Sequence, residues 1–378
     1  MSKIAPDQEF TAAPPRKPRV LVAPLDWGLG HATRCIPIIY ELLEQGASVW
    51  LAAEGAQADL LQTEFPDLPI LPLQGYDVRY SRHARHFTRT ILTQIPRISR
   101  RINHEHRWLK AMMQQYHFDL VLSDNRYGLY HPGAYCVFIT HQLQIQPHWG
   151  KKVKQLLRRW HYSRISHFRE CWVPDLPIPD DLAGELAHPA AMPGTPVYYI
   201  GHLSRLKPVT TSILSRHLFI SLSGPEPQRT LLEEKIIEQI SHYAGTAVIV
   251  RGLPQATRFI PSTGDIRFYN HLDSRDYAAE MQKAQWVISR SGYSTIMDIA
   301  RMGKESILIP TPGQTEQEYL SRYLQQKQWA LAGNQDTFDL NQLLAQAQHF
   351  SYKIPAFKEN RLREEITRVV KRYKSIKV

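Results

Sequence analysis

The sequence predicts an α/β protein made of two successive domains, each built on a parallel sheet. Short apolar runs, typical of strands buried on both faces, alternate along the chain with segments of helical spacing. A strand, a glycine turn and a helix open the chain near Arg19, and the same order begins again near Leu218. The 378 residues, 43% of them hydrophobic, are sufficient for two cores of ordinary size. We expect a disordered lead-in over 1–18, a first domain over 19–204, a second over 205–355 and a C-terminal helix over 356–378.

The first domain is expected to begin after a polar, proline-rich segment that does not resemble a signal peptide. Its first helix should end at Gly46, and a basic helix over 80–116 should be interrupted near Pro96. The expected strands are Arg19–Pro24, Ala47–Ala53, Pro69–Leu73, Phe118–Asp124, Tyr135–Thr140, Cys171–Asp175 and Val197–Ile200.

A glycine turn follows the first strand and contains Gly28, Gly30 and His31. Thr33 stands where the dinucleotide-binding fingerprint has its third glycine, and no acidic residue is clearly placed to hold a ribose after the second strand. An NAD site is therefore disfavoured. His31 is placed either to face a ligand or to pack the turn, and position alone does not separate these interpretations.

Two further strands deliver polar residues to the same edge of the sheet. Asp124 ends one strand and His141 follows the next. Because the carboxyl ends of parallel strands share one edge, where open α/β sheets bind ligands, His31, Asp124 and His141 should gather along one rim.

The net charge of +11 and the pI near 9.5 are strongly basic. Such an excess indicates an anionic partner, which is lipid, nucleic acid or an acidic substrate. The first basic stretch contains Arg79, Arg82, Arg85, Arg89, Arg97, Arg100, Arg101, Arg107 and Lys110 with four histidines, and the second contains Lys151, Lys152, Lys154, Arg158, Arg159, Arg164 and Arg169.

The second basic stretch has the pattern of an amphipathic helix over 151–169. Its apolar positions are Val153, Leu156, Leu157 and Trp160, at i, i+3, i+4 and i+7. A basic helix with an aromatic anchor is typical of segments that lie on anionic membranes. The alternative is an ordinary surface helix that packs this stripe on its own domain.

The second domain contains the βαβ unit that organises the chain. A buried strand over Ala284–Ser289 leads into a turn at Ser291 and Gly292, and Ser294 or Thr295 is expected to cap the following helix, which ends at Gly303. Such a turn offers a helix N-terminus to a phosphate. The other strands expected here are Leu218–Leu222, Thr246–Val250, Ile266–Tyr269 and Ser306–Ile309; a polar glycine turn with Gly224 follows the first, and a loop rich in amides and carboxylates over Thr311–Tyr319 follows the last.

Neither a membrane span nor a disulfide framework is expected. The sequence contains no apolar run near the ~20 residues that cross a bilayer. Cys35, Cys136 and Cys171 are odd in number, distant and without metal-ligand spacing, as suits a reducing cytoplasm.

Taken together, the two tandem domains, the block Gly28–Arg34 and the block Arg290–Ala300 with the loop Gln314–Tyr319 resemble the GT-B glycosyltransferases. The chain is most similar to family 28, which includes the peptidoglycan N-acetylglucosaminyltransferase and the synthases of monogalactosyldiacylglycerol. The resemblance extends over residues 19–331, and is close only in these blocks. It implies two Rossmann-like domains that face a central cleft, and transfer from a nucleotide sugar, a UDP-sugar by analogy, to a lipid-linked or glycan hydroxyl.

The resemblance places the donor in the second domain. It implies that the diphosphate lies against Gly224 and the turn residues, with Arg290 nearby, and that main chain after Tyr269 holds the base. Asp298 matches the family's ribose-binding glutamate with one methylene fewer, and Gln317 and Glu318 match the pair that reads sugar hydroxyls. The implied donor site comprises Gly224, Arg290, Ser291, Gly292, Ser294, Thr295, Asp298, Gln317 and Glu318, and the acceptor side comprises Gly28, Gly30, His31 and His141.

The chemistry agrees with this resemblance. The chain lacks the metal-binding Asp-x-Asp sequence, so helix N-termini and Arg290 would stabilise the leaving diphosphate without a metal or cofactor. The acceptor hydroxyl needs a base, and of the two candidates, His31 and Asp124, we favour His31. An acceptor carried on lipid would explain the basic helix and predicts a cytoplasmic protein at the inner face of a membrane.

Two other function classes remain open at this point. Nucleotide-sugar hydrolases and epimerases share the two-domain fold and would act on the donor alone. A basic nucleic-acid-binding protein would bind with a steep salt dependence, but would leave Gln317, Glu318 and both glycine turns unexplained.

Overall fold

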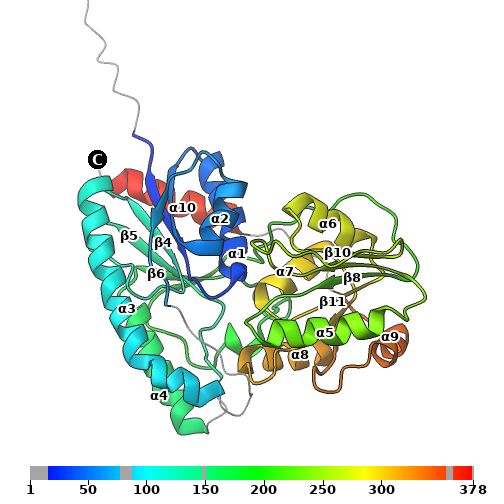
Figure 1. Ribbon diagram of the computed structural model, residues 1–378. Helices are drawn as coiled ribbons and strands as arrows, with labels where there is room; N and C mark the ends of the chain where they lie inside the picture. The colour runs from blue at the N-terminus through cyan, green and yellow to red at the C-terminus, as the bar shows by residue number, and fades with distance from the viewer. Residues whose placement is uncertain (1–15, 77–86, 147–149, 355–360, 377–378) are drawn as a thin grey trace, which may run out of the picture.

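The computed structural model describes residues 16–76, 87–146, 150–354 and 361–376 and has two α/β domains side by side (Figure 1). Within this part of the chain the first sheet has seven parallel strands in the order β3-β2-β1-β4-β5-β6-β7. The second has six parallel strands in the order β10-β9-β8-β11-β12-β13. The predicted fold class is thus confirmed.

The first domain contains every strand that the sequence predicted for it, and one helix that it did not, α2. Its strands are β1 Arg19–Pro24, β2 Ser48–Ala53, β3 Ile70–Pro72, β4 Leu120–Asp124, β5 Tyr135–Ile139, β6 Glu170–Val173 and β7 Val197–Tyr199; its helices are α1 Leu29–Glu44, α2 Gly55–Glu64, α3 Phe87–Tyr116 and α4 Lys151–Ile165, with a 3₁₀ turn at Gly184–Leu186.

The second domain likewise adds a short strand, β13, and a helix, α9, to the predicted elements. Its strands are β8 His217–Ser221, β9 Thr246–Val250, β10 Ile266–Tyr269, β11 Trp286–Ser289, β12 Ser306–Leu308 and β13 Leu331–Ala332; the helices are α5 Gln228–Ile240, α6 Ser274–Lys283, α7 Tyr293–Met302, α8 Thr315–Gln326, α9 Leu340–His349 and, at the end of the chain, α10 Leu362–Ile376.

Alternate residues of the second sheet belong to different cores, because successive side chains of a strand point to opposite faces. In β8, Leu218 and Ile220 pack with α5 and α9 on one face. Phe219 packs on the other, in a cluster that continues through α7 and α1 into the first domain. The interface between the domains is therefore part of a shared core near α1 and α7.

Helix α3 continues through Pro96, so the predicted interruption there is wrong. A proline removes one hydrogen bond from a helix but does not end it where the flanking turns are held by packing. Pro96 is exposed, whereas Ile102, Leu109 and Met113 bury the following turns against the domain. Of the basic residues predicted in this stretch, Arg79, Arg82 and Arg85 lie outside the described residues.

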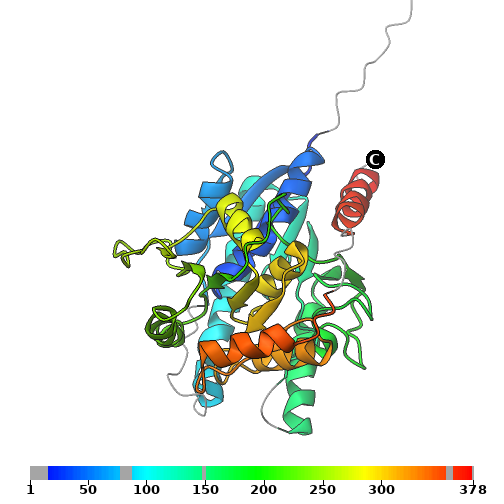
Figure 2. The same cartoon turned by 90° about the vertical axis from the view of Figure 1, so that its right-hand side faces the viewer.

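Helix α10 returns to the first domain at the end of the chain, as Figures 1 and 2 show. Ile366 and Val369 are buried, and Arg368 Nη2 lies 2.7 Å from Oε1 of Glu170 in β6. The guanidinium of Arg368 also covers the ring of Tyr198 at 4.0 Å. Helix α10 thus packs on the domain that β1 begins.

The described helices include none that is both long enough and apolar enough to cross a membrane.

Candidate functional site

The N-termini of α1 and α7 meet between the two domains (Figure 1). The Oγ of Ser294 in α7 donates a hydrogen bond of 2.8 Å to the carbonyl of Gly30 in α1. A Cβ on Gly30 would lie 3.0 Å from that hydroxyl, so a glycine permits this approach. Each helix N-terminus presents free N–H groups and a positive dipole end, and the two together favour an anion.

The predicted cap of α7 is wrong. The residue before its first turn is Gly292, and neither Ser294 nor Thr295 caps the helix, because both already lie inside it. The Ser294 hydroxyl instead bonds the other domain, and Thr295 is half-buried in the first turn.

His31, Asp124 and His141 do gather at one rim of the first sheet. Nδ1 of His31 lies 3.1 Å from Oδ2 of Asp124. The register of β1, β4 and β5 places Pro24, Asp124 and Ile139 side by side, which brings the ends of these strands level. The pair formed by a histidine and a buried carboxylate is the arrangement that orients an imidazole as a general base.

Arg34 completes this pair, and sequence reasoning missed it. Its guanidinium binds Asp124 through Nε, at 2.7 Å from Oδ2, and through Nη2 with Oδ1. Nη2 is also 2.7 Å from Nδ1 of His31. Arg34 follows His31 by three residues and therefore lies on the same face of α1. This spacing was the one sign in the sequence that the two side chains are neighbours.

These contacts set the charges of the pair. Burial and the neighbouring guanidinium of Arg34 lower the pKa of His31, and the contact with Asp124 opposes this only in part. Burial alone would raise the pKa of Asp124, yet the charge of Arg34 and the contact with His31 hold it well below its usual range. At neutral pH the site therefore contains a neutral imidazole beside a carboxylate and a guanidinium.

His141 links this group to the second domain. Its Nδ1 lies 3.1 Å from Nη1 of Arg34, and its Nε2 lies 2.7 Å from Oε1 of Glu316 at the start of α8. The imidazole also stacks on the ring of Tyr293, with centroids 4.2 Å apart and planes 5° from parallel. Glu316 is the second functional candidate that the sequence did not reveal, since nothing in a local pattern indicates a contact between domains.

The donor-side loops converge in front of α7. The Oγ of Ser291 donates to the carbonyl of Gln317 at 2.8 Å, and the backbone N–H of Thr311 donates to Oε1 of Gln317 at 2.9 Å. Gly224 lies beside Thr311, and Gly292 beside the amide nitrogen of Gln317. The structure thus brings together residues from three segments that the sequence assigned to one site.

The contacts of the Arg290 side chain differ from those that the sequence predicted. Its side chain is fully buried, and it donates to the carbonyls of Gln228 at 2.6 Å, Pro310 at 3.2 Å and Ile309 at 3.3 Å. Burial lowers its pKa to about 10. Arg290 therefore holds the loops after β11 and β12 and the start of α5, and in this arrangement does not present a cation to a phosphate.

Asp298 lies in α7, one turn after Ser294. Its Oδ1 accepts a hydrogen bond of 2.6 Å from Ser204 in the segment that joins the domains. Burial raises its pKa to about 6, although Arg205 and the Ser204 hydroxyl act in the opposite direction. Glu318, the other predicted acid, accepts from the N–H of Gly313 at 2.8 Å.

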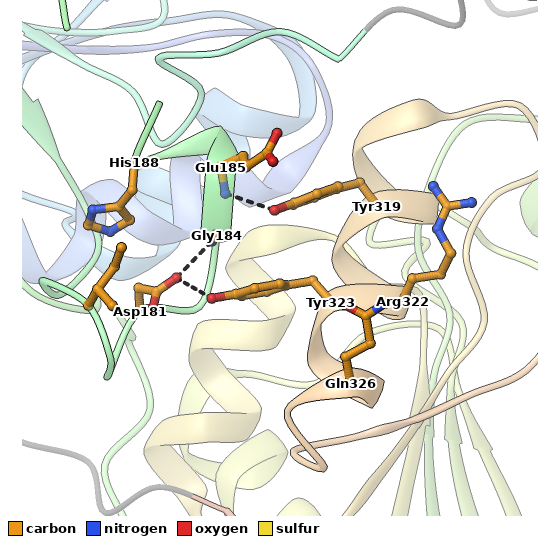
Figure 3. A pocket seen from close by; sticks show the side chains of 9 residues that line it. Asp181, Gly184, Glu185, His188, Tyr319, Arg322, Tyr323 and Gln326 are labelled. Carbon is orange, nitrogen blue, oxygen red and sulfur yellow. Dashed lines mark hydrogen bonds between the residues drawn. The ribbon is translucent and has the colours of Figure 1, made fainter. Parts of the chain in front are cut away.

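A cavity of about 420 Å³ lies beside this site, between residues 178–188 of the first domain and α8 (Figure 3). Within the described residues Asp175, Asp181 and His188 have the spacing of metal ligands. However, Asp181 already binds the ammonium of Lys327 at 2.8 Å and the hydroxyl of Tyr323 at 2.6 Å. The carboxylate of Asp181 is thus satisfied by donors of the chain, and we assign no metal to this group.

The chain is similar to known glycosyltransferases. Residues 228–373 match the model of the glycosyltransferase family 28 C-terminal domain. A protein of Methanosarcina acetivorans with the name "Uncharacterized glycosyltransferase" is 25% identical over 318 residues, which are 77% of each chain.

Solved glycosyltransferase structures share the fold. The glycosyltransferase of kitacinnamycin has a TM-score of 0.60 at 12% identity, with 96% of each chain covered. MurG of Acinetobacter baumannii has a TM-score of 0.51 at 16% identity, with 95% of each chain covered. The spinosyn rhamnosyltransferase SpnG, in complex with thymidine diphosphate, has a TM-score of 0.57 at 14% identity, with 94% of this chain and 96% of its own covered. The family model, the named relative and this shared architecture identify the chain as a glycosyltransferase of the GT-B fold that resembles family 28.

Proposed function

We propose that this protein transfers a sugar from a nucleoside diphosphate sugar to a hydroxyl of a lipid-linked or glycan acceptor, without a metal. The observation that supports it most is the His31–Asp124 pair, placed where the N-termini of α1 and α7 meet. In this proposal His31 accepts the proton of the acceptor hydroxyl, and the helix ends stabilise the diphosphate that leaves.

The donor lies in the second domain in this proposal. Its diphosphate contacts the N–H groups at the turns of Gly224 and Gly292, and its sugar faces Gln317 and Glu318. Asp298 accepts hydrogen bonds from the ribose. The bound thymidine diphosphate in the similar SpnG structure supports a nucleoside diphosphate as the ligand class, and leaves the base to be determined.

We expect nucleoside diphosphates to raise the melting temperature of the protein, and to bind more tightly as the pH rises from 5 to 7. Asp298 accepts hydrogen bonds best as a carboxylate, and its pKa of about 6 means that it ionises in this interval. Thermal unfolding with UDP, dTDP, GDP and ADP, each at several pH values, measures both effects.

Asp298→Asn should reduce the affinity by about 10- to 100-fold, since a hydrogen bond to a charged group contributes about 1.5–3 kcal/mol. The variant should also lose the dependence on pH. Asp276→Asn, an exposed carboxylate of α6, is the matched control and should bind like the wild type. The donor site would be wrong if none of the four nucleotides shifted the melting temperature.

Transfer must also be separated from hydrolysis and epimerisation, which the same fold supports. Turnover of a donor sugar in the absence of any acceptor would favour a hydrolase or an epimerase over the proposed transferase.

The lipid part of the proposal is supported by α4. Leu156 is 68% exposed and Trp160 is 37% exposed, which leaves part of the apolar stripe available to a membrane. Val153 and Leu157 are half-buried and Trp160 packs on the ring of Tyr127, so the stripe also contacts its own domain in part. His161 and Ile165 bury the other face of the helix. Lys152 and Arg159 are exposed near the stripe, Lys154 and Arg158 are half-buried, and the side chain of Lys151 lies outside the described residues.

We expect the protein to sediment with vesicles that contain 30 mol% phosphatidylglycerol in phosphatidylcholine, and less with pure phosphatidylcholine. Leu156→Glu should weaken this binding because it places a charge in the apolar stripe. Gln155→Glu adds the same charge at the neighbouring exposed position and should weaken binding less. Equal losses in the two variants would show that charge alone attracts the protein, and would contradict insertion of the stripe.

A further inference from the structure

A chain of polar contacts crosses from the second domain to the His31–Asp124 pair. It runs from Glu316 through His141 to Arg34, with distances of 2.7 Å and 3.1 Å. Arg34 then binds Asp124 and His31. His141 and Arg34 are buried, and the side chain of Glu316 is 23% exposed.

The donors and acceptors of this chain have one consistent direction. A guanidinium donates and never accepts, so Nδ1 of His141 accepts from Arg34. A neutral His141 then has its proton on Nε2, which donates to the carboxylate of Glu316. Burial would favour the neutral acid of Glu316, but its pKa is lowered because His141, His31 and Arg34 lie close.

The state of His31 depends on where Arg34 lies. When Nδ1 of His31 carries the proton, it donates to Asp124 and leaves Nε2 free to accept a proton. When Nδ1 accepts from Arg34, the proton is on Nε2 and the ring is no longer a base. The two contacts therefore exclude each other, and a small movement of Arg34 decides between them. Nδ1 lies nearer to Nη2 of Arg34, at 2.7 Å, than to Oδ2 of Asp124, at 3.1 Å, so the arrangement with the domains in contact favours the proton on Nε2.

The position of α8 that brings Glu316 to His141 is fixed by further contacts with the first domain (Figure 3). Tyr319 Oη accepts from the N–H of Glu185 at 2.7 Å, and Tyr323 Oη donates to Asp181 at 2.6 Å. Glu316, Tyr319 and Tyr323 are spaced by three and four residues, which puts them on one face of the helix.

Gly184 allows Tyr319 and Tyr323 to approach the first domain closely. It has a positive φ of 52°, and a Cβ there would lie 2.4 Å from the hydroxyl of Tyr319 and 2.9 Å from Cζ of Tyr323. The two tyrosines thus pack directly on the backbone of the first domain.

We propose that Glu316, His141 and Arg34 form a positioning relay, through which the position of the donor domain decides the tautomer of His31. With the domains in contact Arg34 donates to Nδ1 of His31, and when Glu316 withdraws Arg34 is released and Nδ1 can donate to Asp124. The relay rests on the proposed function, because it acts on the His31–Asp124 pair to which that function assigns the role of general base. Glu316 immediately precedes Gln317 and Glu318, so the helix that would bind the donor sugar also carries the first member of the relay. Proton acceptance by His31 is thereby coupled to the position of the donor domain.

The test is the tautomer of His31, read from the ¹⁵N chemical shifts of its two ring nitrogens in histidine-labelled protein, with His31→Gln to assign the signals. We expect the wild type to carry the proton of His31 on Nε2, because Nδ1 accepts from Arg34. Glu316→Leu should lose this single form, and Glu316→Gln, which keeps an acceptor oxygen, should restore much of it. Glu238→Gln removes an exposed charge from α5 and should leave His31 as in the wild type.

His141→Phe provides a second break in the relay if Glu316→Leu fails to fold, because a phenyl ring preserves the stacking on Tyr293. Unchanged ¹⁵N shifts of His31 in both folded variants, or a proton on Nδ1 in the wild type, would overturn the relay. The measurement uses no substrate. A failure of nucleotide binding would therefore refute the proposed function without altering these spectra, and the two outcomes are distinguishable.

Discussion

His31→Gln is expected to lower kcat by about 10²- to 10⁴-fold and to leave nucleotide binding intact, because loss of a general base removes that much from a proton-transfer step. The imidazole is in the first domain, whereas the predicted nucleotide contacts are in the second. Donor binding, followed by thermal unfolding, and sugar transfer, followed by release of the nucleoside diphosphate, separate the two effects.

The pH profile gives a second check on the same residue. Burial and Arg34 lower the pKa of His31 below its ordinary 6.5, so the imidazole stays neutral further into the acid range. The acid limb of the kcat profile should therefore fall below pH 6.5. His242→Gln, an exposed histidine, is the matched control. Full activity in His31→Gln would transfer the role of base to Asp124 or to the substrate.

Arg126→Met is expected to lower the free energy of unfolding by about 3–5 kcal/mol, the cost of leaving a buried charge without its partner. Arg126 and Glu105 are both fully buried, with Nη1 and Oε1 2.9 Å apart. Arg126 Nε also donates to the carbonyl of Pro24 at 2.7 Å, and Tyr76 Oη donates to Oε2 of Glu105 at 2.9 Å. Thermal and urea unfolding of the first domain measure the loss.

The double variant Arg126→Met with Glu105→Gln should recover part of this loss, since no buried charge is then left unpaired. Arg107→Met, on the exposed face of α3, should change stability by less than about 0.5 kcal/mol. If the double variant were no more stable than the single one, packing of the Arg126 stem, and not the charge pair, would account for the effect.

The strands could be predicted from the sequence because strands buried on both faces appear as short apolar runs. The sequence was insufficient for α2, whose segment over 55–64 buries only Gln57, Leu60 and Leu61 and so shows little helical periodicity. The rim residues could be predicted together because parallel strands share an edge. Helical spacing could have placed Arg34 beside His31, but neither its bond to Asp124 nor the contact of Glu316 with His141 could be predicted, since these partners lie far along the chain.

The corrections have a similar cause. Ser294 has the side chain of a helix cap, but its hydroxyl bonds Gly30 across the domain interface. Arg290 follows a strand at a phosphate-type turn, yet its guanidinium binds three carbonyls of neighbouring loops. In both cases the residue type indicated a polar contact correctly, and the fold supplied a different partner.

The contact between Glu170 and Arg368 can form only late in synthesis. The carboxylate of Glu170 is almost fully buried and accepts from Tyr135, Trp172 and Arg368, and the guanidinium that neutralises it follows 198 residues later. At about 5–20 residues per second, a ribosome needs roughly ten to forty seconds to supply it. Until then the first domain must hold Glu170 without its cation, so a nascent chain released before α10 would leave a buried carboxylate of β6 without Arg368.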